Sequence, residues 1–260
     1  MRKAKGARHH HTSNLISLAD EDAVKEVVWS SILGLWDVVN TLTRLRPSRS
    51  RRYRVSIFGS ARVKRGSFGY EETKRVAEAL AEMGCDIITG GGPGLMQAAN
   101  EGASRAPERS RSYGIRVTLP FEQNVNAFVS QAFEHQTFFT RLQQFVMTSD
   151  AFIVAPGGVG TVLEMMMIWQ LLQVQHVQKT TPLILVGKMW PGLIEWAKSS
   201  MLSTDPPLAN REDMTIPVCV SDADEAILLV RKHHRAWLTA QKRDNKPATK
   251  NRGKRMTGRR

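Results

Sequence analysis

Three glycine-bearing turns carry the residues that could do chemistry in this chain. Each follows a short apolar segment: Gly59-Ser60, Gly90-Gly91-Gly92-Pro93-Gly94 and Gly157-Gly158-Val159-Gly160-Thr161. Glycine lets backbone N–H groups turn toward an anion without a Cβ in the way, and the dipole of a following helix favours negative charge. Thr161 adds a hydroxyl donor to the third turn. Three such turns together favour a phosphate or nucleotide site over simple chain reversal.

The spacing of the glycines limits the size of the expected ligand. The first apolar segment ends in GSARVKRG, which lacks the G-x-G-x-x-G spacing of a dinucleotide site. A Walker loop is also missing from the sequence, since no glycine-lysine-serine/threonine run occurs. We therefore expect a mononucleotide or a ligand of that size, and we disfavour hydride transfer and hydrolysis of nucleoside triphosphates.

An alternation of strands and helices predicts the scaffold that positions these turns. The expected strands lie within 54–60, 85–94, 113–119, 151–158, 182–187 and 216–221. The expected helices are 70–83, 95–102, 138–149, 161–175, 191–201 and 223–237. Short apolar strands, each followed by a helix, indicate an α/β fold, an open doubly wound parallel sheet of Rossmann type. In such a sheet, ligands bind beyond the carboxyl ends of the strands.

Charge and periodicity divide the chain into a central domain with appendages. We expect a basic disordered N-terminus over 1–19, a helix and basic linker over 20–52, a catalytic domain over 53–238 and a basic disordered tail over 239–260. The helix should run from Asp20 to Arg46 and pack on the domain or on a second subunit. The net charge of +13 is confined to the ends, with +6 in residues 1–54, +8 in 241–260 and −1 between them. The basic ends are either solvated termini or a weak contact for nucleic acid.

The composition argues against a disulfide-linked, metal-binding, membrane-spanning or secreted protein. Apolar residues make up 42% of the chain, which is ordinary for a globular domain. Cys85 and Cys219 lie in apolar surroundings and are expected to be small buried residues. His135 and His176 lack metal-ligand spacing, so we expect neither a metal nor another cofactor. The sequence lacks a long apolar run and a secretory signal, and we expect a cytoplasmic protein.

The chain contains the motif GGGPGLMQAANEGA and, after it, the motif PGGVGTVLE, which ends at Glu164. These two motifs resemble those of the Lonely Guy family, the cytokinin riboside 5′-monophosphate phosphoribohydrolases and related nucleotide nucleosidases. Arg141 stands 15 residues before Pro156, at the spacing that the family shows. The resemblance is to the longer bacterial branch and covers roughly residues 53–237. This chain departs from the family pattern at Leu142, where lysine is usual, and at Leu163, where an acid is common.

The resemblance implies hydrolysis of the N-glycosidic bond of a nucleoside 5′-monophosphate, of the AMP or cytokinin riboside monophosphate type. The products would be a free base and ribose 5-phosphate. Glu164 would stabilise the positive charge that develops on the sugar and orient or deprotonate the attacking water. Arg141 would bind the phosphate or ribose, or hold Glu164 in position. The alternative, purely structural roles are a surface ion pair for Arg141 and, for Glu164, an acid that only complements the dipole of its helix.

The resemblance also implies the other contacts of the nucleotide. The phosphate would lie on Gly157, Gly158, Gly160 and Thr161, with Glu122 on the ribose hydroxyls and Ser60, Gly91 and Met96 as further contacts. A homodimer or larger even assembly is expected, because family sites are completed near a subunit contact. The alternative function is a non-catalytic binder of a mononucleotide or cofactor on the same fold.

Overall fold

The computed structural model describes residues 20–42, 52–117 and 125–244. The chain divides into two compact units, residues 1–49 and residues 50–260, and each is described by itself. Glu122 and residues 1–19 and 245–260 lie outside the described residues, whereas residues 239–244 of the expected disordered tail are helical. The larger unit contains the predicted sheet and all three glycine turns.

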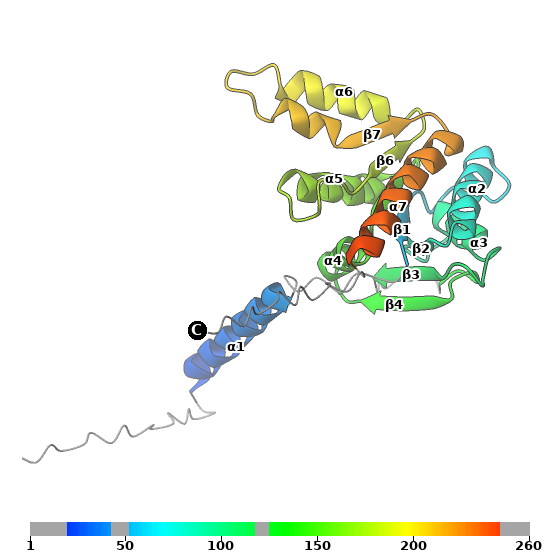
Figure 1. Ribbon diagram of the computed structural model, residues 1–260. Helices are drawn as coiled ribbons and strands as arrows, with labels where there is room; N and C mark the ends of the chain where they lie inside the picture. The colour runs from blue at the N-terminus through cyan, green and yellow to red at the C-terminus, as the bar shows by residue number, and fades with distance from the viewer. Residues whose placement is uncertain (1–19, 43–51, 118–124, 245–260) are drawn as a thin grey trace, which may run out of the picture. The chain divides into compact units, whose positions relative to one another are not determined.

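Seven parallel strands form one sheet in the order β4-β3-β2-β1-β5-β6-β7 (Figure 1). The strands are β1 (Arg54–Phe58), β2 (Asp86–Thr89), β3 (Ser112–Val117), β4 (Gln131–His135), β5 (Ala151–Val154), β6 (Leu183–Val186) and β7 (Pro217–Val220). The chain builds the sheet outward from β1 to β4 and then returns to place β5 against the other side of β1. The predicted Rossmann-like α/β fold is confirmed.

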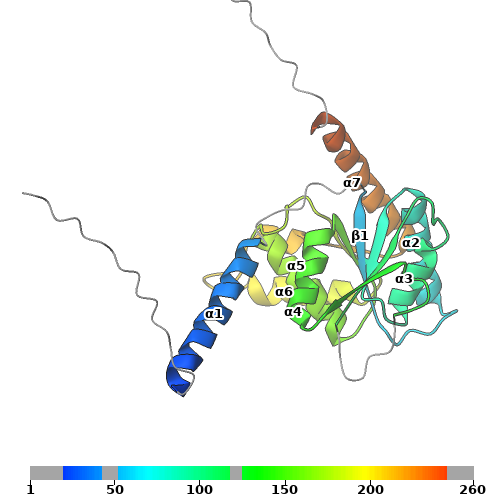
Figure 2. The same ribbon diagram turned by 90° about the horizontal axis from the view of Figure 1, so that it is seen from below.

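Six helices cover the two faces of this sheet. They are α2 (Phe68–Glu82), α3 (Leu95–Ala103), α4 (Phe138–Thr148), α5 (Val159–Gln173), α6 (Trp190–Met201) and α7 (Ala223–Asp244), and a short 3₁₀ helix, η1 (Arg211–Thr215), precedes β7. Figure 2 shows α2, α3 and α7 on one face and α4, α5 and α6 on the other. Each face of the sheet has its own apolar core. Because side chains alternate across the sheet, Val55 and Ile57 pack in one core and Phe58 packs in the other.

The strand order reverses between β1 and β5, and doubly wound sheets bind their ligands beside such a reversal. The turns that follow these two strands are joined by a hydrogen bond from the Ser60 N–H to the Pro156 carbonyl, 3.1 Å long. The Ser60 carbonyl in turn accepts from the Leu95 N–H at 2.9 Å, at the start of α3. The three glycine turns therefore meet at one edge of the sheet, the carboxyl edge.

The structure differs from the sequence prediction at several elements, including α2, which begins at Phe68 instead of Tyr70, and η1, which was not predicted. β4 was not predicted, because its sequence QAFEH forms an exposed edge strand without a continuous apolar run. α5 begins at Val159, two residues earlier than expected, so Glu164 lies in its second turn. α7 runs to Asp244 instead of ending at Trp237. Its last turns are polar and exposed, so the apolar period that marks a buried helix stops before the helix does.

The smaller unit contains α1 (Glu21–Leu42), which confirms most of the predicted N-terminal helix. Acidic residues in its first turn complement the helix dipole. Several of its large apolar side chains are exposed, namely Val27, Val28, Trp29, Ile32 and Leu33. The expected packing partner of this helix stays a prediction. Within the described ranges, no helix is both long enough and apolar enough to cross a membrane.

Candidate functional site

An ion pair between Arg141 and Glu164 lies at the carboxyl edge of the sheet. Nη1 of Arg141 on α4 is 3.1 Å from Oε1 of Glu164 on α5, and the two side chains are only 13% and 12% exposed. The Arg141 Nε–H also donates to the Ile115 carbonyl of β3 at 2.9 Å. Its guanidinium lies over the Phe145 ring, 5.3 Å from the centroid. Three elements thus fix the arginine, and both alternatives named above, a surface ion pair and a helix-dipole acid, are disfavoured.

Burial sets the protonation state of Glu164. Removing the carboxylate from water disfavours its charged form and raises its pKa to about 7, although the neighbouring Arg141 acts in the opposite direction. A carboxyl group with a pKa near neutrality can both accept and donate a proton at physiological pH. The pair therefore has the electrostatic character of a general acid–base site.

The third glycine turn leads into the helix that carries Glu164. A Cβ at Gly157 would lie 2.2 Å from the Thr161 hydroxyl oxygen, so only glycine lets the turn fold back on Thr161. A Cβ at Gly158 or Gly160 would meet nothing within 4 Å. Gly158 caps α5 without a side-chain hydrogen bond. The first-turn N–H groups of α5 are therefore left without a side-chain cap, as an anion site requires.

The second glycine turn lies directly against the ion pair. A Cβ at Gly90 would lie 2.5 Å from Nη2 of Arg141 and 2.6 Å from the sulfur of Met96. The methyl group of Met96 is similarly close to Gly92. The absence of side chains at these glycines is what allows Arg141 to reach Glu164 beside the turn.

A buried polar network, absent from the sequence prediction, holds this turn in shape. The Asn126 side-chain amide donates to the carbonyls of Gly91 and Gly92, each at 3.0 Å, and to Oδ1 of Asn100 at 2.9 Å. Asn100 also accepts from the Thr89 hydroxyl and donates to the Ser112 hydroxyl, both at 2.7 Å. The asparagines could have been suspected only from their positions beside the glycines, because tertiary packing decides their partners.

We predict that Asn100→Ala destabilises the fold by about 2–3 kcal/mol, since the Thr89 and Ser112 hydroxyls would be buried without this partner. The free energy of unfolding from urea titration measures this loss. Ser104→Ala is a suitable control, because Ser104 is exposed and its hydroxyl only donates to the Glu101 carbonyl one turn away. Equal stability of the two variants would contradict a structural role for the network.

The structure brings together most of the predicted site residues. Arg141, Glu164 and Met96 converge on the second glycine turn, and the third turn leads into the same helix as Glu164. Ser60 joins the turns through its backbone, while its hydroxyl accepts from the Arg62 N–H at 3.1 Å. Gly91 is buried and turned toward Val125. The roles of all these residues toward a ligand stay predictions.

The burial of Leu142 is consistent with its departure from the family pattern, which has lysine at this position. Its side chain is only 4% exposed on α4, so a lysine in this orientation would bury its charge. Leu163, the second departure, is instead half exposed on α5.

A cleft lies elsewhere, between α6 and η1. It has a volume of about 580 Å³ and includes Lys198, Ser203, Arg211 and Met214 in its lining. None of the glycine turns contributes to it, and neither does the Arg141–Glu164 pair. We assign the candidate site to the carboxyl edge, because the buried Arg141–Glu164 pair and the uncapped start of α5 lie there.

Comparisons with known proteins identify the family. The model of a family described as "Possible lysine decarboxylase" matches residues 96–230, which begin just after the second glycine turn and include Arg141, the third glycine turn and Glu164. The pyrimidine/purine nucleotide 5′-monophosphate nucleosidase of Escherichia coli K12 is 30% identical over 125 residues. That alignment covers 45% of this chain and 28% of the enzyme, so the chain matches little more than a quarter of its relative's length.

Two solved structures share the fold. The molybdenum cofactor binding protein of Rippkaea orientalis has 19% identity and a TM-score of 0.53, covering 70% of this chain and 97% of that protein. The molybdenum cofactor carrier protein of Chlamydomonas reinhardtii has 16% identity and a TM-score of 0.53, covering 71% and 99%. At these identities the likeness concerns the fold alone.

Proposed function

The chain belongs to the family described as possible lysine decarboxylases, the Lonely Guy type, and on this basis we propose that it hydrolyses nucleoside 5′-monophosphates. The reaction would release a free base and ribose 5-phosphate. The observation that carries the proposal is the buried Arg141–Glu164 pair beside two glycine turns. The nucleosidase relative from Escherichia coli supports the same reaction class.

In the proposed reaction, the nucleotide is held by its phosphate on the third glycine turn. The exposed Gly158–Gly160 backbone and the start of α5 provide N–H donors and a favourable dipole for the anion. Glu164 lies on the same helix, one turn beyond Thr161, so the ribose of a nucleotide bound in this way would extend toward its carboxylate. We propose that Ser60, Gly91, Met96 and Glu122 complete the nucleotide site.

The chemistry follows from the charge that develops on the sugar. The bond between C1′ and the base nitrogen breaks, its electron pair leaves with the base, and C1′ becomes oxocarbenium-like. Ionised Glu164 stabilises this cation and takes a proton from the water that forms the new C1′–O bond. The leaving base takes a proton from solvent. Glu164 then returns its proton to solvent, which restores the starting state. Arg141 keeps a fraction of Glu164 ionised near pH 7.

A non-catalytic binder is the second candidate function. It draws on the two structural neighbours, which are named as a binding protein and a carrier of molybdenum cofactor. A binder has no need of a buried carboxylate with a pKa of about 7 next to an arginine. That pair is the reason for preferring the enzyme.

The two functions are separated by incubating the full chain with a panel of nucleoside 5′-monophosphates and the matching nucleosides. Free base is then measured by chromatography, beside a Glu164→Gln control. We expect release of base from at least one monophosphate, little release from its nucleoside, and none above background with the control. Nucleotide binding without release of base from any substrate would favour the binder.

We further propose that the chain forms a homodimer through the outer surface of α4 and α5. Large apolar side chains are exposed there, with Phe138 and Phe139 on α4 and Val159, Leu163 and Met166 on α5. The Arg141–Glu164 contact joins these two helices, so the surface lies beside the candidate site. An exposed apolar surface of this kind marks an interaction site.

Sedimentation of the protein at micromolar concentration tests the dimer. We expect about twice the chain mass of 29.1 kDa. The double variant Phe139→Lys, Leu163→Lys should be monomeric, whereas Leu228→Lys, at a residue 63% exposed on α7, should stay dimeric. A monomeric wild type would refute the dimer.

A further inference from the structure

Two basic parts of the chain, far apart in sequence, meet at the edge of the sheet opposite the glycine turns. Tyr53 at the start of β1 is fully buried, and its ring lies 5.4 Å from that of Trp237 and 5.0 Å from that of His234, both on α7. Because all strands are parallel, the first residues of β1, β2 and β3 share this edge, the amino edge. Arg52 and Arg54 flank Tyr53 in the chain, so this end of β1 lies next to the basic half of α7, while the Arg54 side chain lies over the Tyr113 ring of β3.

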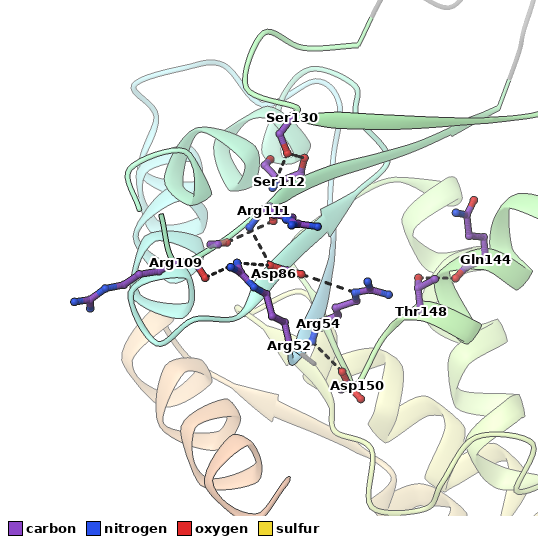
Figure 3. A network of polar contacts seen from close by, with 11 residues as sticks. Arg52, Arg54, Asp86, Arg109, Arg111, Ser112, Ser130, Gln144, Thr148 and Asp150 are labelled. Atoms are coloured by element: carbon purple, nitrogen blue, oxygen red, sulfur yellow. Dashed lines mark hydrogen bonds and ion pairs between the residues drawn. The ribbon is translucent and has the colours of Figure 1, made fainter. Parts of the chain in front are cut away.

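The buried carboxylate of Asp86 contacts the side chains of Arg52 and Arg54 at the amino edge (Figure 3). Asp86 is 3.4 Å from Nη1 of Arg52 and 3.9 Å from Nε of Arg54, and it accepts from the Arg111 N–H at 3.0 Å. Arg52 also donates to the Arg109 carbonyl at 2.8 Å. The side chains of Arg109 and Arg111 are exposed. The nearby acids are Asp150, which accepts from the Arg54 N–H, and the exposed Glu82 and Glu108.

The second half of α7 continues the positive charge. Its exposed basic residues are Arg231, Lys232, Arg235, Lys242 and Arg243. After Glu225 the helix has no acidic residue until Asp244. His234 and Trp237 face Tyr53, so they are occupied in packing. The 16 residues that follow the helix add seven Lys or Arg and no acid.

We propose that this amino-edge basic surface, formed by Arg52, Arg54, Arg109, Arg111 and the basic residues of α7 from Arg231 to Arg243, binds nucleic acid through its phosphate backbone. Arginine presents a planar fork that matches phosphate oxygens. Asp86 holds the side chains of Arg52 and Arg54, and the Glu82 carbonyl holds that of Arg109. Neutralising phosphates releases condensed counterions, which supplies affinity without reading the sequence.

Two features of the surface favour nucleic acid over a lipid membrane. The four cations of the sheet edge are all arginines, which suits bidentate phosphate contacts. The aromatic side chains that could insert into a bilayer are engaged elsewhere, since Tyr53 is buried and Trp237 packs on it. The surface lies at the opposite edge of the sheet from the proposed nucleosidase site, so the two activities are separable.

The test measures fluorescence anisotropy of a labelled 20-nucleotide RNA and of a DNA of the same sequence, titrated with the full chain at several salt concentrations. We expect dissociation constants of about 1–100 µM at low salt, which rise steeply with salt. Arg109→Gln with Arg111→Gln should weaken binding by about 20-fold at 0.1 M salt and make the salt dependence shallower, as expected for two lost phosphate contacts. Base release from a nucleotide should be unchanged in this variant.

The matched control removes two exposed cations from another part of the surface, Lys198→Gln with Arg211→Gln in the cleft between α6 and η1. It should bind like the wild type, and thermal unfolding should show that both double variants are folded. Equal losses in both variants would overturn the proposal, since net charge alone would then explain the binding. Absence of binding to RNA and DNA at 50 mM salt would also overturn it, whether or not vesicles of phosphatidylserine and phosphatidylcholine bind.

Discussion

Replacing Glu164 by glutamine is expected to lower kcat for base release by about 10²–10⁴-fold, the range associated with a positioned acid–base group. Glutamine has nearly the same shape as glutamate and keeps an oxygen that can accept from Arg141. It supplies no negative charge to the oxocarbenium-like sugar and takes no proton from water. Single-turnover chromatography of base released from the preferred nucleotide measures the effect.

Nucleotide binding separates this loss from damage to the fold. Isothermal titration with ribose 5-phosphate should give a dissociation constant for Glu164→Gln within a few-fold of the wild-type value, because the phosphate is assigned to the third glycine turn. Glu101→Gln is the matched control, since Glu101 is also a buried glutamate with an arginine partner, Arg65 at 3.1 Å. Retention of full activity by Glu164→Gln would remove the mechanism proposed here.

The order of strands and helices could be predicted from the sequence, because each buried strand is a short apolar run and each helix has apolar residues at helical spacing. β4 lacks that signal, since only one neighbour strand pairs with it and most of its side chains are exposed. The end of α7 escaped prediction for the same physical reason. Helical backbone persists there without an apolar face to mark it.

In the candidate site, too, some residues could be predicted from the sequence and others could not. Arg141 and Glu164 could be predicted because their types and spacing match a family motif, and the structure places them 3.1 Å apart. Asn100 and Asn126 could not, because an amide finds its partners only after distant segments have packed. The shifted pKa of Glu164 is also a product of packing, since α4, α5 and the second glycine turn together exclude water from it.

The second large effect is expected from Arg141→Gln, and it depends on pH. Arg141 lowers the pKa of Glu164, while burial raises it to about 7 in the intact pair. Removing the arginine leaves burial unopposed, so the pKa of Glu164 should rise further. If ionised Glu164 is the active form, activity increases as pH rises through this pKa. The rising limb of the pH–rate profile should therefore move from about pH 7 to more alkaline values.

The expected loss of kcat is roughly tenfold at pH 7 and becomes smaller by pH 9, where Glu164 in the variant is ionised again. Steady-state kinetics between pH 5.5 and 9.5 would separate the roles open to Arg141. A higher KM with an unshifted profile would mean that it binds phosphate or ribose, whereas a shifted profile means that it sets the charge of Glu164. Arg75→Gln on α2 is the matched control, because that arginine also pairs with carboxylates, Glu72 and Asp224, on the other face of the sheet. A profile of Arg141→Gln that matches the wild type in both position and height would show that the ion pair has no part in catalysis.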